Sequence, residues 1–291
     1  MNSSAITLQD SVEFRIVSDP PQFQSAASPA AVVTNGQDAP LLQVQGVRKA
    51  YGGLEAVSGV DLGLIEGRIT GLIGPNGAGK TTLLNVISGV ERATAGRIQF
   101  LGDEIGSLPQ HRLAARGLVR TFQISRELGQ LTVLENLLLA RASQTGEGLI
   151  SVFARPGRIR REEEAAIEVA RSALQRVNLW RLADESAANL SGGQKKLLEL
   201  SRALMLKPRL ILLDEPAAGV APVMEEVLVA TIRRLSGEGV NFLIVEHDLD
   251  VVAALCDHVY VMAAGKVLTE GPFAEVVSDA RVVEAYLGLK T

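Results

Sequence analysis

Cysteine is almost absent from this sequence, which contains one, Cys256, in 291 residues. A single cysteine cannot form an internal disulfide, so a small secreted domain held together by disulfides is excluded and a reducing cytosol is favoured. Cys256 lies in an apolar stretch with no second cysteine or basic cluster beside it. We therefore expect a small buried hydrophobic residue there and not a reactive thiol.

An excess of basic charge and long apolar runs are also missing. The 29 Lys and Arg are outnumbered by 33 Asp and Glu, which leaves no whole-chain basic field to hold a nucleic-acid backbone. No apolar run reaches the ~18 residues that a transmembrane helix requires. Residues 1–10 lack the basic and apolar regions of a secretory signal. We expect a cytoplasmic chain that spans no membrane, does not bind nucleic acid, and is able to dock on a membrane protein.

The hydrophobic content of 47% is enough for one large α/β domain with a modest appendage. Residues 1–40 differ from the rest by their prolines and an alanine-rich run, which predict a mostly irregular, flexible leader. Within it Val12, Phe14 and Ile16 alternate with charged residues and predict one short strand. One folded domain is expected at residues 41–288.

From residue 41 the apolar pattern becomes regular and predicts an α/β fold with a parallel core sheet. Alternating apolar residues from Leu42 to Leu64 predict two or three antiparallel strands. Compact apolar runs predict further strands at residues 69–73, 210–213, 242–245, 259–262 and near 267. Helices are expected at residues 81–88, about 194–206 and 274–287. One more helix is expected in the segment that contains residues 228 and 235. Between about residues 109 and 190 the apolar period is helical, which predicts a largely helical insertion.

A glycine-rich loop between a predicted strand and a predicted helix is the first motif that carries chemistry. Residues 74–81 satisfy G-x-x-x-x-G-K-[ST] in the strand–loop–helix context that such a match requires. The glycines let backbone N–H groups face phosphate oxygens, Lys80 reaches the β- and γ-phosphates, and the Thr81 hydroxyl is placed to ligate Mg²⁺. The residues expected to bind a nucleotide here are Gly74, Pro75, Asn76, Gly77, Ala78, Gly79, Lys80, Thr81 and Thr82.

Two acids follow the apolar run at residues 210–213. A buried strand of an α/β sheet delivers such side chains at its carboxyl end, where these sheets bind ligands. Asp214 is suited to hold Mg²⁺, and Glu215 is suited to polarise the water that attacks the γ-phosphate. An apolar run ending in two acids is by itself more typical of a strand leaving the core. The phosphate-binding loop in the same chain favours the catalytic interpretation.

Residues 190–194 read Leu-Ser-Gly-Gly-Gln ahead of a predicted helix. Ser191 takes the N-cap position, Gly192 and Gly193 leave room for a second anion, and Gln194 follows. Because this motif lies between the phosphate-binding loop and the acidic strand, the sequence resembles the ATP-binding subunits of ABC transporters over about residues 42–288. The resemblance implies a P-loop ABC cassette with a mainly parallel core sheet, an antiparallel β subdomain and a helical insertion at about 109–190.

The resemblance also assigns roles to single residues. Tyr51 resembles the aromatic residue that stacks on adenine, although without the other motifs it reads as an ordinary core or surface tyrosine. Gln123 resembles the glutamine that touches Mg²⁺ and the attacking water, and His247 resembles the switch histidine that hydrogen-bonds the γ-phosphate. Ala221 departs from the family, since an Asp or Asn is usual there, and this bears on communication between the two active sites. The resemblance implies as catalytic residues Lys80, Glu215 and His247, and as metal ligands Thr81, Gln123 and Asp214.

In this family the signature of one subunit completes the ATP site of another. The resemblance therefore implies a dimer with a second ABC ATPase subunit, identical or different, with ATP held between Lys80 of one chain and Ser191 of its partner. It also implies integral-membrane permease subunits, docked on the helical insertion, and indirectly a solute-binding protein. The chain is then peripheral on the inner face of the cell membrane. ATP and Mg²⁺ are the expected cofactors, and ATP hydrolysis coupled to transport is the expected reaction.

Within the family, the sequence is similar to the branched-chain amino-acid (Liv-type) importer ATPases, through the stretches at residues 131–137, 140–164, 214–219 and 283–288. Relatives that import urea or short amides share this architecture, and a lipopolysaccharide-extracting ATPase has the same fold and chemistry with a different permease. Both stay open as alternatives. A soluble mechanochemical ABC ATPase typically shows tandem cassettes or a long coiled-coil insertion. A small-molecule P-loop kinase leaves the signature and His247 unexplained.

Overall fold

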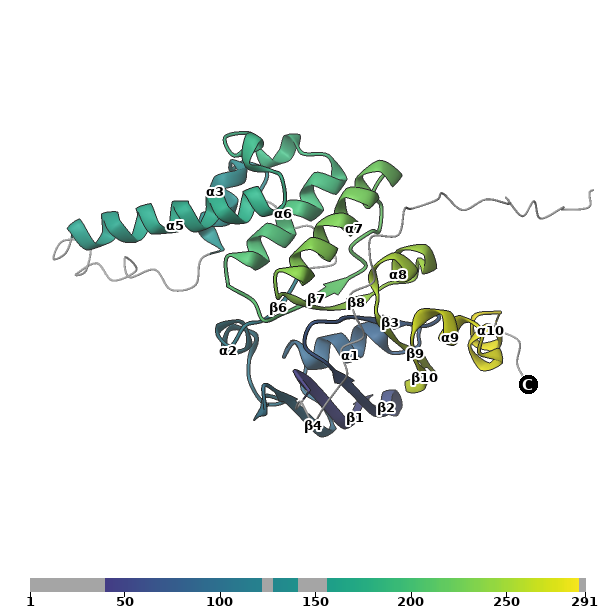
Figure 1. Ribbon diagram of the computed structural model, residues 1–291. Helices are drawn as coiled ribbons and strands as arrows, with labels where there is room; N and C mark the ends of the chain where they lie inside the picture. Colours follow the sequence, from purple (N-terminus) through teal and green to yellow (C-terminus); the bar gives the residue numbers. More distant parts are fainter. Residues whose placement is uncertain (1–39, 122–127, 141–155, 288–291) are drawn as a thin grey trace, which may run out of the picture. The chain divides into compact units, whose positions relative to one another are not determined.

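The computed structural model describes residues 40–121, 128–140 and 156–287. In this part of the chain two β-sheets carry helices packed against them (Figure 1). The leader expected at residues 1–40, with its short strand around Phe14, lies outside the described residues except for Pro40. The boundary near residue 40 therefore stays a prediction.

The smaller sheet joins the two strands of the alternating stretch at residues 42–64 to two strands at residues 95–104 that the sequence did not predict. Its strands in spatial order are β2 (Leu54–Leu64), β1 (Leu42–Tyr51), β4 (Ala95–Phe100) and β5 (Asp103–Glu104). All pairings are antiparallel, with Leu42 of β1 opposite Leu64 of β2 and Phe100 of β4. These three side chains are buried, so the alternation places one face of the sheet in a core, as predicted.

The larger sheet has six strands in the order β10-β9-β3-β8-β7-β6. Their bounds are β3 (Ile69–Ile73), β6 (Leu118–Arg120), β7 (Leu210–Asp214), β8 (Asn241–Val245), β9 (His258–Ala263) and β10 (Lys266–Gly271). All neighbours run parallel except β9 and β10. Every residue of β3, β7 and β8 is buried, because helices or the second sheet cover both faces. This explains why these strands read as continuous apolar runs in the sequence.

Helices are distributed over both faces of this sheet (Figure 1). They are α1 (Lys80–Ile87), α2 (Gln110–Ala115), α3 (Val133–Leu139), α5 (Pro156–Arg176), α6 (Gly192–Leu204), α7 (Pro222–Gly237), α8 (Leu249–Leu255), α9 (Phe273–Val277) and α10 (Ala280–Leu287), with 3-10 turns at Trp180–Leu182 and Ala187–Asn189. None of the helices in the described ranges is long and apolar enough to cross a membrane. The arrangement confirms the predicted fold class.

The helical group formed by α3, α5 and α6 packs above the sheet in Figure 1. α5 and the residue directly after it bury the face that the helical period predicts, consisting of Ala166, Ala170, Ala173, Leu174 and Val177. All of these side chains except Ala166 join the same core as β7 residue Ile211 and α7 residue Leu228. The opposite face of the sheet shares its core with α1 and the antiparallel sheet. The core sheet is therefore the platform on which both subdomains rest.

Several elements differ from the sequence expectation. Strands β4 and β5 lie at residues 95–104, where no strand was predicted. Strand β6 lies inside the stretch whose period is helical, because a three-residue strand is too short to give a period-2 signal. The seven-residue helix α8 was not anticipated for the same reason of length. The closing helix expected at residues 274–287 is split into α9 and α10, where the Asp279 carboxylate accepts the N–H of Arg281 and starts a new helix.

Cys256 follows α8 and is buried in the core, as expected. A Cβ atom added to Gly71 of β3 would lie 2.8 Å from its sulfur, so the thiol fills the space that this glycine leaves. Burial raises the pKa of Cys256 from 9.0 to about 12. At neutral pH the group is therefore a protonated, inaccessible thiol.

We expect Cys256 in the folded chain to resist Ellman's reagent at mildly alkaline pH. The thiolate is the reacting form, and a pKa raised from 9.0 to about 12 lowers its fraction about a thousandfold. The measurement compares labelling rates of the native chain and of the chain in guanidinium chloride, which should expose one reactive thiol per chain. Rapid labelling of the native chain would contradict the buried position.

Candidate functional site

The glycine-rich loop joins β3 to α1 at the carboxyl edge of the core sheet. Gly74 and Gly79 adopt positive φ angles of 144° and 98°. A Cβ atom at Gly74 would lie 2.1 Å from the carbonyl oxygen of Met262, and one at Gly79 would lie 2.4 Å from that of Ala56. No side chain fits at either position, so these glycines are required for the loop to adopt this conformation.

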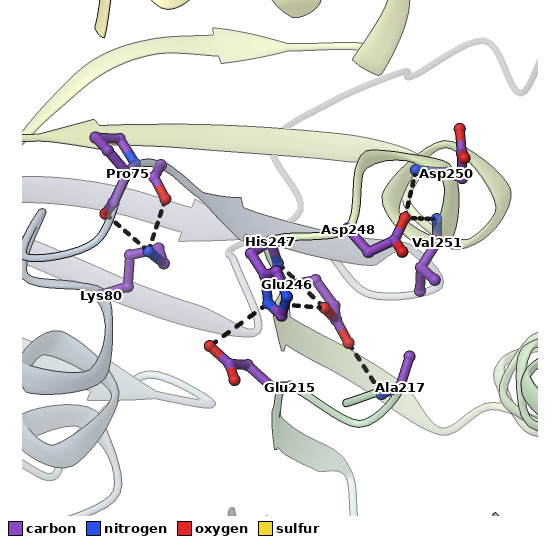
Figure 2. Close-up of polar contacts among 10 residues, drawn as sticks. Pro75, Lys80, Glu215, Ala217, Glu246, His247, Asp248, Asp250 and Val251 are labelled. Carbon is purple, nitrogen blue, oxygen red and sulfur yellow. Dashed lines mark hydrogen bonds and ion pairs between the residues drawn. The ribbon is translucent and has the colours of Figure 1, made fainter. Parts of the chain in front are cut away.

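Lys80 begins α1, and its side chain returns into the loop. Its ammonium donates to the carbonyl oxygens of Gly74 at 2.7 Å and Pro75 at 3.0 Å (Figure 2). Burial lowers the pKa of Lys80, and the negative charges of Glu215 and Asp214 act in the opposite sense. Lys80 therefore lies within electrostatic reach of two adjacent acids that are more than a hundred residues away in the sequence.

Tyr51 lies at the end of β1 and is 45% exposed. Its hydroxyl donates a hydrogen bond to Glu91, and this bond is the main cause that raises the pKa of Tyr51. The hydroxyl also interacts with the Thr82 side chain, and the Lys49 ammonium lies 4.9 Å from the ring centroid. The structure thus places an exposed aromatic ring beside the start of α1, where a planar base can stack on it.

Asp214 ends β7, and its carboxylate is almost completely buried. The Oδ2 atom accepts a hydrogen bond from Arg120 at 2.9 Å, whereas Oδ1 has no hydrogen-bond partner among the described residues. A buried carboxylate oxygen without a partner is costly unless a ligand satisfies it. Hard oxygen atoms are the ligands that Mg²⁺ prefers, and the exposed Thr81 at the start of α1 supplies another. The residues present therefore fit the expected cation.

Glu215 and His247 face each other at the ends of β7 and β8 (Figure 2). Glu215 Oε1 lies 3.7 Å from His247 Nδ1, and both side chains are open to solvent. The backbone holds Glu215 at a φ of 49°, a left-handed conformation that is uncommon for residues with a side chain. Its N–H donates to the carbonyl oxygen of Val245 at 2.8 Å. A strained backbone is typical of functional sites, and here it occurs at Glu215, an acid close to the Lys80 ammonium.

Glu246 is a buried carboxylate that ties two loops of this edge together. One of its oxygens accepts the N–H of Ala217 at 3.0 Å, and the other accepts the N–H of His247 at 3.1 Å (Figure 2). Burial raises the pKa of Glu246 above its ordinary value, against the lowering effect of backbone hydrogen bonds from Ala217, His247 and Asp248. The carboxylate therefore fixes the segment after β7 relative to the segment after β8.

Ser191 caps α6 as the sequence predicts. Its Oγ accepts the N–H of Gln194 at 3.3 Å, and its own N–H donates to the Gln194 side chain at 2.8 Å, which forms a capping box. Gly193 packs on α7, since a Cβ atom there would lie 2.6 Å from Cβ of Met224. Ser191 and Gly192 are exposed, and the described hydrogen bonds of Ser191 stay within its own helix. The signature is not brought to the phosphate-binding loop of the same chain by any described contact.

Gln123 and Ala221 are the two remaining positions that the resemblance singled out. Gln123 lies outside the described residues, so its place at the metal stays a prediction. Ala221 is the N-cap residue of α7 and supplies no side-chain cap, while its carbonyl oxygen accepts the N–H groups of Met224 and Glu225. The Asp or Asn usual in the family is suited to cap the helix here.

Arg120 and Glu246 contact the predicted residues Asp214 and His247 directly, although neither of them was assigned a role from the sequence. Glu246 stands between a buried strand and His247, and an apolar run followed by polar residues signals only that a strand ends there. Arg120 ends a strand that was itself missed. Burial of a charged side chain depends on partners far away in the sequence, and here the Arg120–Asp214 pair joins residues 94 positions apart.

Two known families match the chain. The family described as ABC transporter matches residues 57–218, which is more than half of the chain. The family described as branched-chain amino acid ATP-binding cassette transporter matches residues 266–288 at the carboxyl end.

Curated relatives match over most of their length. The probable branched-chain amino acid transport ATP-binding protein LivG of Archaeoglobus fulgidus is 45% identical over 248 residues, covering 85% of this chain and 95% of the relative. The high-affinity branched-chain amino acid transport ATP-binding protein BraF of Pseudomonas aeruginosa is 40% identical over 250 residues, covering 86% and 98%.

Solved structures of ATP-binding cassettes also match this chain. A nucleotide-free ATP-binding cassette from an ABC transporter matches with a TM-score of 0.75 at 39% identity, covering 85% of this chain and 98% of that chain. A dimeric bacterial ABC transporter cassette matches with a TM-score of 0.65 at 26% identity, covering 80% and 98%.

The raised pKa of Glu246 predicts a pH dependence of stability. The folded chain binds this proton more tightly than the unfolded chain, so the group's contribution is fully present below about pH 4.5 and is lost as pH rises through the folded pKa. Glu246→Gln cannot ionise, so its unfolding free energy relative to the original chain should rise across this window. Urea unfolding at a series of pH values measures the difference, with Glu226→Gln at an exposed position as control. Parallel curves for Glu246→Gln and the original chain would contradict the prediction.

Proposed function

The chain belongs to the ABC transporter family of ATP-binding proteins, and we propose that it is the ATPase of an uptake system for branched-chain or other hydrophobic amino acids. The observation that carries the proposal is the cluster at the carboxyl edge of the core sheet. There the loop cation Lys80 lies within electrostatic reach of Asp214 and Glu215, and Glu215 faces His247. The amino-acid substrate is supported by the relatives and by the match at residues 266–288.

ATP binds, in this proposal, between the glycine-rich loop and Tyr51. The loop N–H groups and the positive end of α1 hold the phosphates, and adenine stacks on the Tyr51 ring. Lys80 exchanges the carbonyl oxygens of Gly74 and Pro75 for oxygens of the β- and γ-phosphates. Because the ammonium carries three donors, this exchange costs little beyond the two hydrogen bonds it replaces.

Thr81, Gln123 and Asp214 are the residues proposed to hold Mg²⁺. The support for Asp214 is its buried Oδ1 atom, which has no partner among the described residues. When bound, the ion neutralises charge on the phosphates and so favours attack by water.

Glu215 is the proposed general base, which takes the proton of the attacking water. Its 29% exposed side chain is open to a water molecule, and its N–H is fixed by Val245. His247 is proposed to hydrogen-bond the γ-phosphate. Glu246 accepts the N–H groups of His247 and of Ala217, and Ala217 follows Glu215 by two residues. Glu246 therefore ties the segment that carries the proposed base to the segment that carries His247.

We assign the exposed signature at Ser191 to the ATP site of a second subunit. In the described part of the chain its backbone and side chain bond only to Gln194 and Lys195 of the same helix, so its exposed face is available to a partner. A dimeric cassette among the similar structures supports this arrangement. The second subunit is an identical or a related ABC ATPase, and each ATP lies between Lys80 of one chain and Ser191 of the other.

The complete transporter in this proposal contains integral-membrane permease subunits and receives solute from a binding protein. The chain then lies on the inner face of the membrane through its permease contact. The helical insertion at about residues 109–190, which contains α3 and α5, is the proposed docking surface. Closure of the ATPase dimer on ATP and its opening after hydrolysis form the two-state element that drives the permease.

Glu215→Gln is expected to bind ATP as the original chain does but to lose turnover. The substitution removes the base and leaves the phosphate contacts in place, so ATP hydrolysis should fall by about 10²–10⁴-fold and a nucleotide-bound dimer should accumulate. Size-exclusion chromatography with Mg-ATP and a phosphate-release assay measure both effects. Glu163→Gln, at an exposed position of α5, is the matched control. Normal hydrolysis by Glu215→Gln would exclude Glu215 as the base.

The transported solute is tested with the complete complex. Tagged Glu215→Gln chain, purified from its own membranes in mild detergent with Mg-ATP, should retain two different polytopic permeases and a second ATPase subunit. Reconstituted with its binding protein, the unmutated complex should increase ATP hydrolysis with leucine and not with urea. Stimulation by urea, or recovery with lipopolysaccharide-transport proteins, ribosomes or DNA-repair factors, would overturn the amino-acid assignment.

A further inference from the structure

Arg120 and Asp214 form a buried ion pair at the centre of the site. Arg120 ends β6, and its Nη2 atom donates to Asp214 Oδ2 at 2.9 Å, with 14% and 1% of the two side chains exposed. Among the described ion pairs this is the one in which both side chains are least exposed when the two partners are taken together. Burying two charges costs desolvation free energy. The attraction within the pair offsets this cost only when further hydrogen bonds satisfy the remaining donors and acceptors.

The second arm of the guanidinium supplies those bonds. Arg120 Nη1 donates to Asn85 Oδ1 at 2.6 Å and to Ser88 Oγ at 3.2 Å, both on or directly after α1. One side chain therefore spans the acid at the end of β7 and the helix that follows the phosphate-binding loop. A lysine in its place presents a point charge and cannot keep this planar fork.

Asn85 extends the network to the ring of Tyr51. Its Nδ2 donates to Glu91 Oε1 at 2.9 Å, while its Oδ1 accepts from Arg120. The amide orientation is determined, because a carboxylate only accepts and a guanidinium only donates. Glu91 in turn accepts the Tyr51 hydroxyl. A continuous chain of hydrogen bonds thus joins the exposed ring to the Asp214 carboxylate.

We infer that Arg120 is a positioning residue that fixes the Asp214 carboxylate so that Oδ1 faces the cation of the nucleotide. This inference rests on the proposed Mg-ATP site and adds a residue to it. The evidence is that the two oxygens of the carboxylate differ. Oδ2 accepts a hydrogen bond from Arg120, whereas Oδ1 has no partner among the described residues. An arginine that only competed with the cation would have no reason to be anchored by Asn85 and Ser88.

Residues that orient a metal ligand change metal affinity when they are replaced. For Arg120→Lys, which keeps the charge and loses the fork, we expect the Mg²⁺ concentration at half-maximal effect to rise about 10–100-fold. Asn85→Ala removes a hydrogen bond that anchors Arg120 but leaves Asp214 unchanged. This variant should also raise the Mg²⁺ concentration at half-maximal effect, by a smaller factor. Binding of ATP in EDTA should stay unchanged, because the loop contacts do not involve Arg120.

The experiment titrates Mg²⁺ into the full-length chain with fluorescent mant-ATP and compares dissociation constants with Mg²⁺ and with EDTA. Arg120→Lys, Arg120→Met and Asn85→Ala are measured beside Arg233→Lys, a control in an exposed Arg–Asp pair with Asp257 at the other edge of the sheet. Thermal unfolding of each variant shows that it is folded. If Arg120→Met does not fold, the other two variants decide.

A selective loss of the Mg²⁺-dependent gain in affinity supports the inference. Two results overturn it. A lower melting temperature with unchanged Mg²⁺ dependence means that Arg120 only stabilises the fold, and a lower Mg²⁺ requirement means that Arg120 competes with the cation for Asp214. Failure of the proposed function looks different, since the original chain itself would then bind mant-ATP without any dependence on Mg²⁺.

Discussion

Parallel hydrogen bonding among β3, β8 and β7 is the constraint on which the site depends. Leu72 of β3 and Asp214 of β7 both pair with Val245 of β8, so the three strands end at the same level of the sheet. The residues that follow them must meet at one edge, which is where α/β sheets bind ligands. The N–H of Glu215 bonds to Val245 and extends the ladder one residue past β7. The candidate base is thereby positioned by the backbone of the sheet.

The charges at this edge are held by partners from several elements. Lys80 bonds to its own loop, Asp214 to the end of β6, and Glu246 to the two loops beside it. These hydrogen bonds offset the desolvation of the buried charges at this edge, and the Asp214 oxygen proposed for the cation is left without a partner among the described residues. A network of this kind is preorganised, because its charged side chains are already held in place by hydrogen bonds.

Elements with a long or strongly patterned sequence were predicted correctly. The apolar strands, the strand–loop–helix unit around Lys80, the cap of α6 at Ser191 and the buried face of α5 all follow from local spacing. Strand β6 and helix α8 were missed, since three and seven residues contain too little periodicity to identify an element. The division of the last helix at Asp279 was also missed, because a single cap competed with a continuous apolar pattern.

The sequence by itself determined the chemistry of this protein, because motifs such as residues 74–81 and 190–194 are local and need no knowledge of the fold. Only the tertiary structure decided which side chains meet. Arg120 and Asp214 are 94 residues apart, and Glu246 and Ala217 are 29 apart. Contacts at such separations are created by strand order and register, which apolar spacing alone does not specify. Burial then determines which of these charged groups must be paired and which oxygen stays open for a ligand.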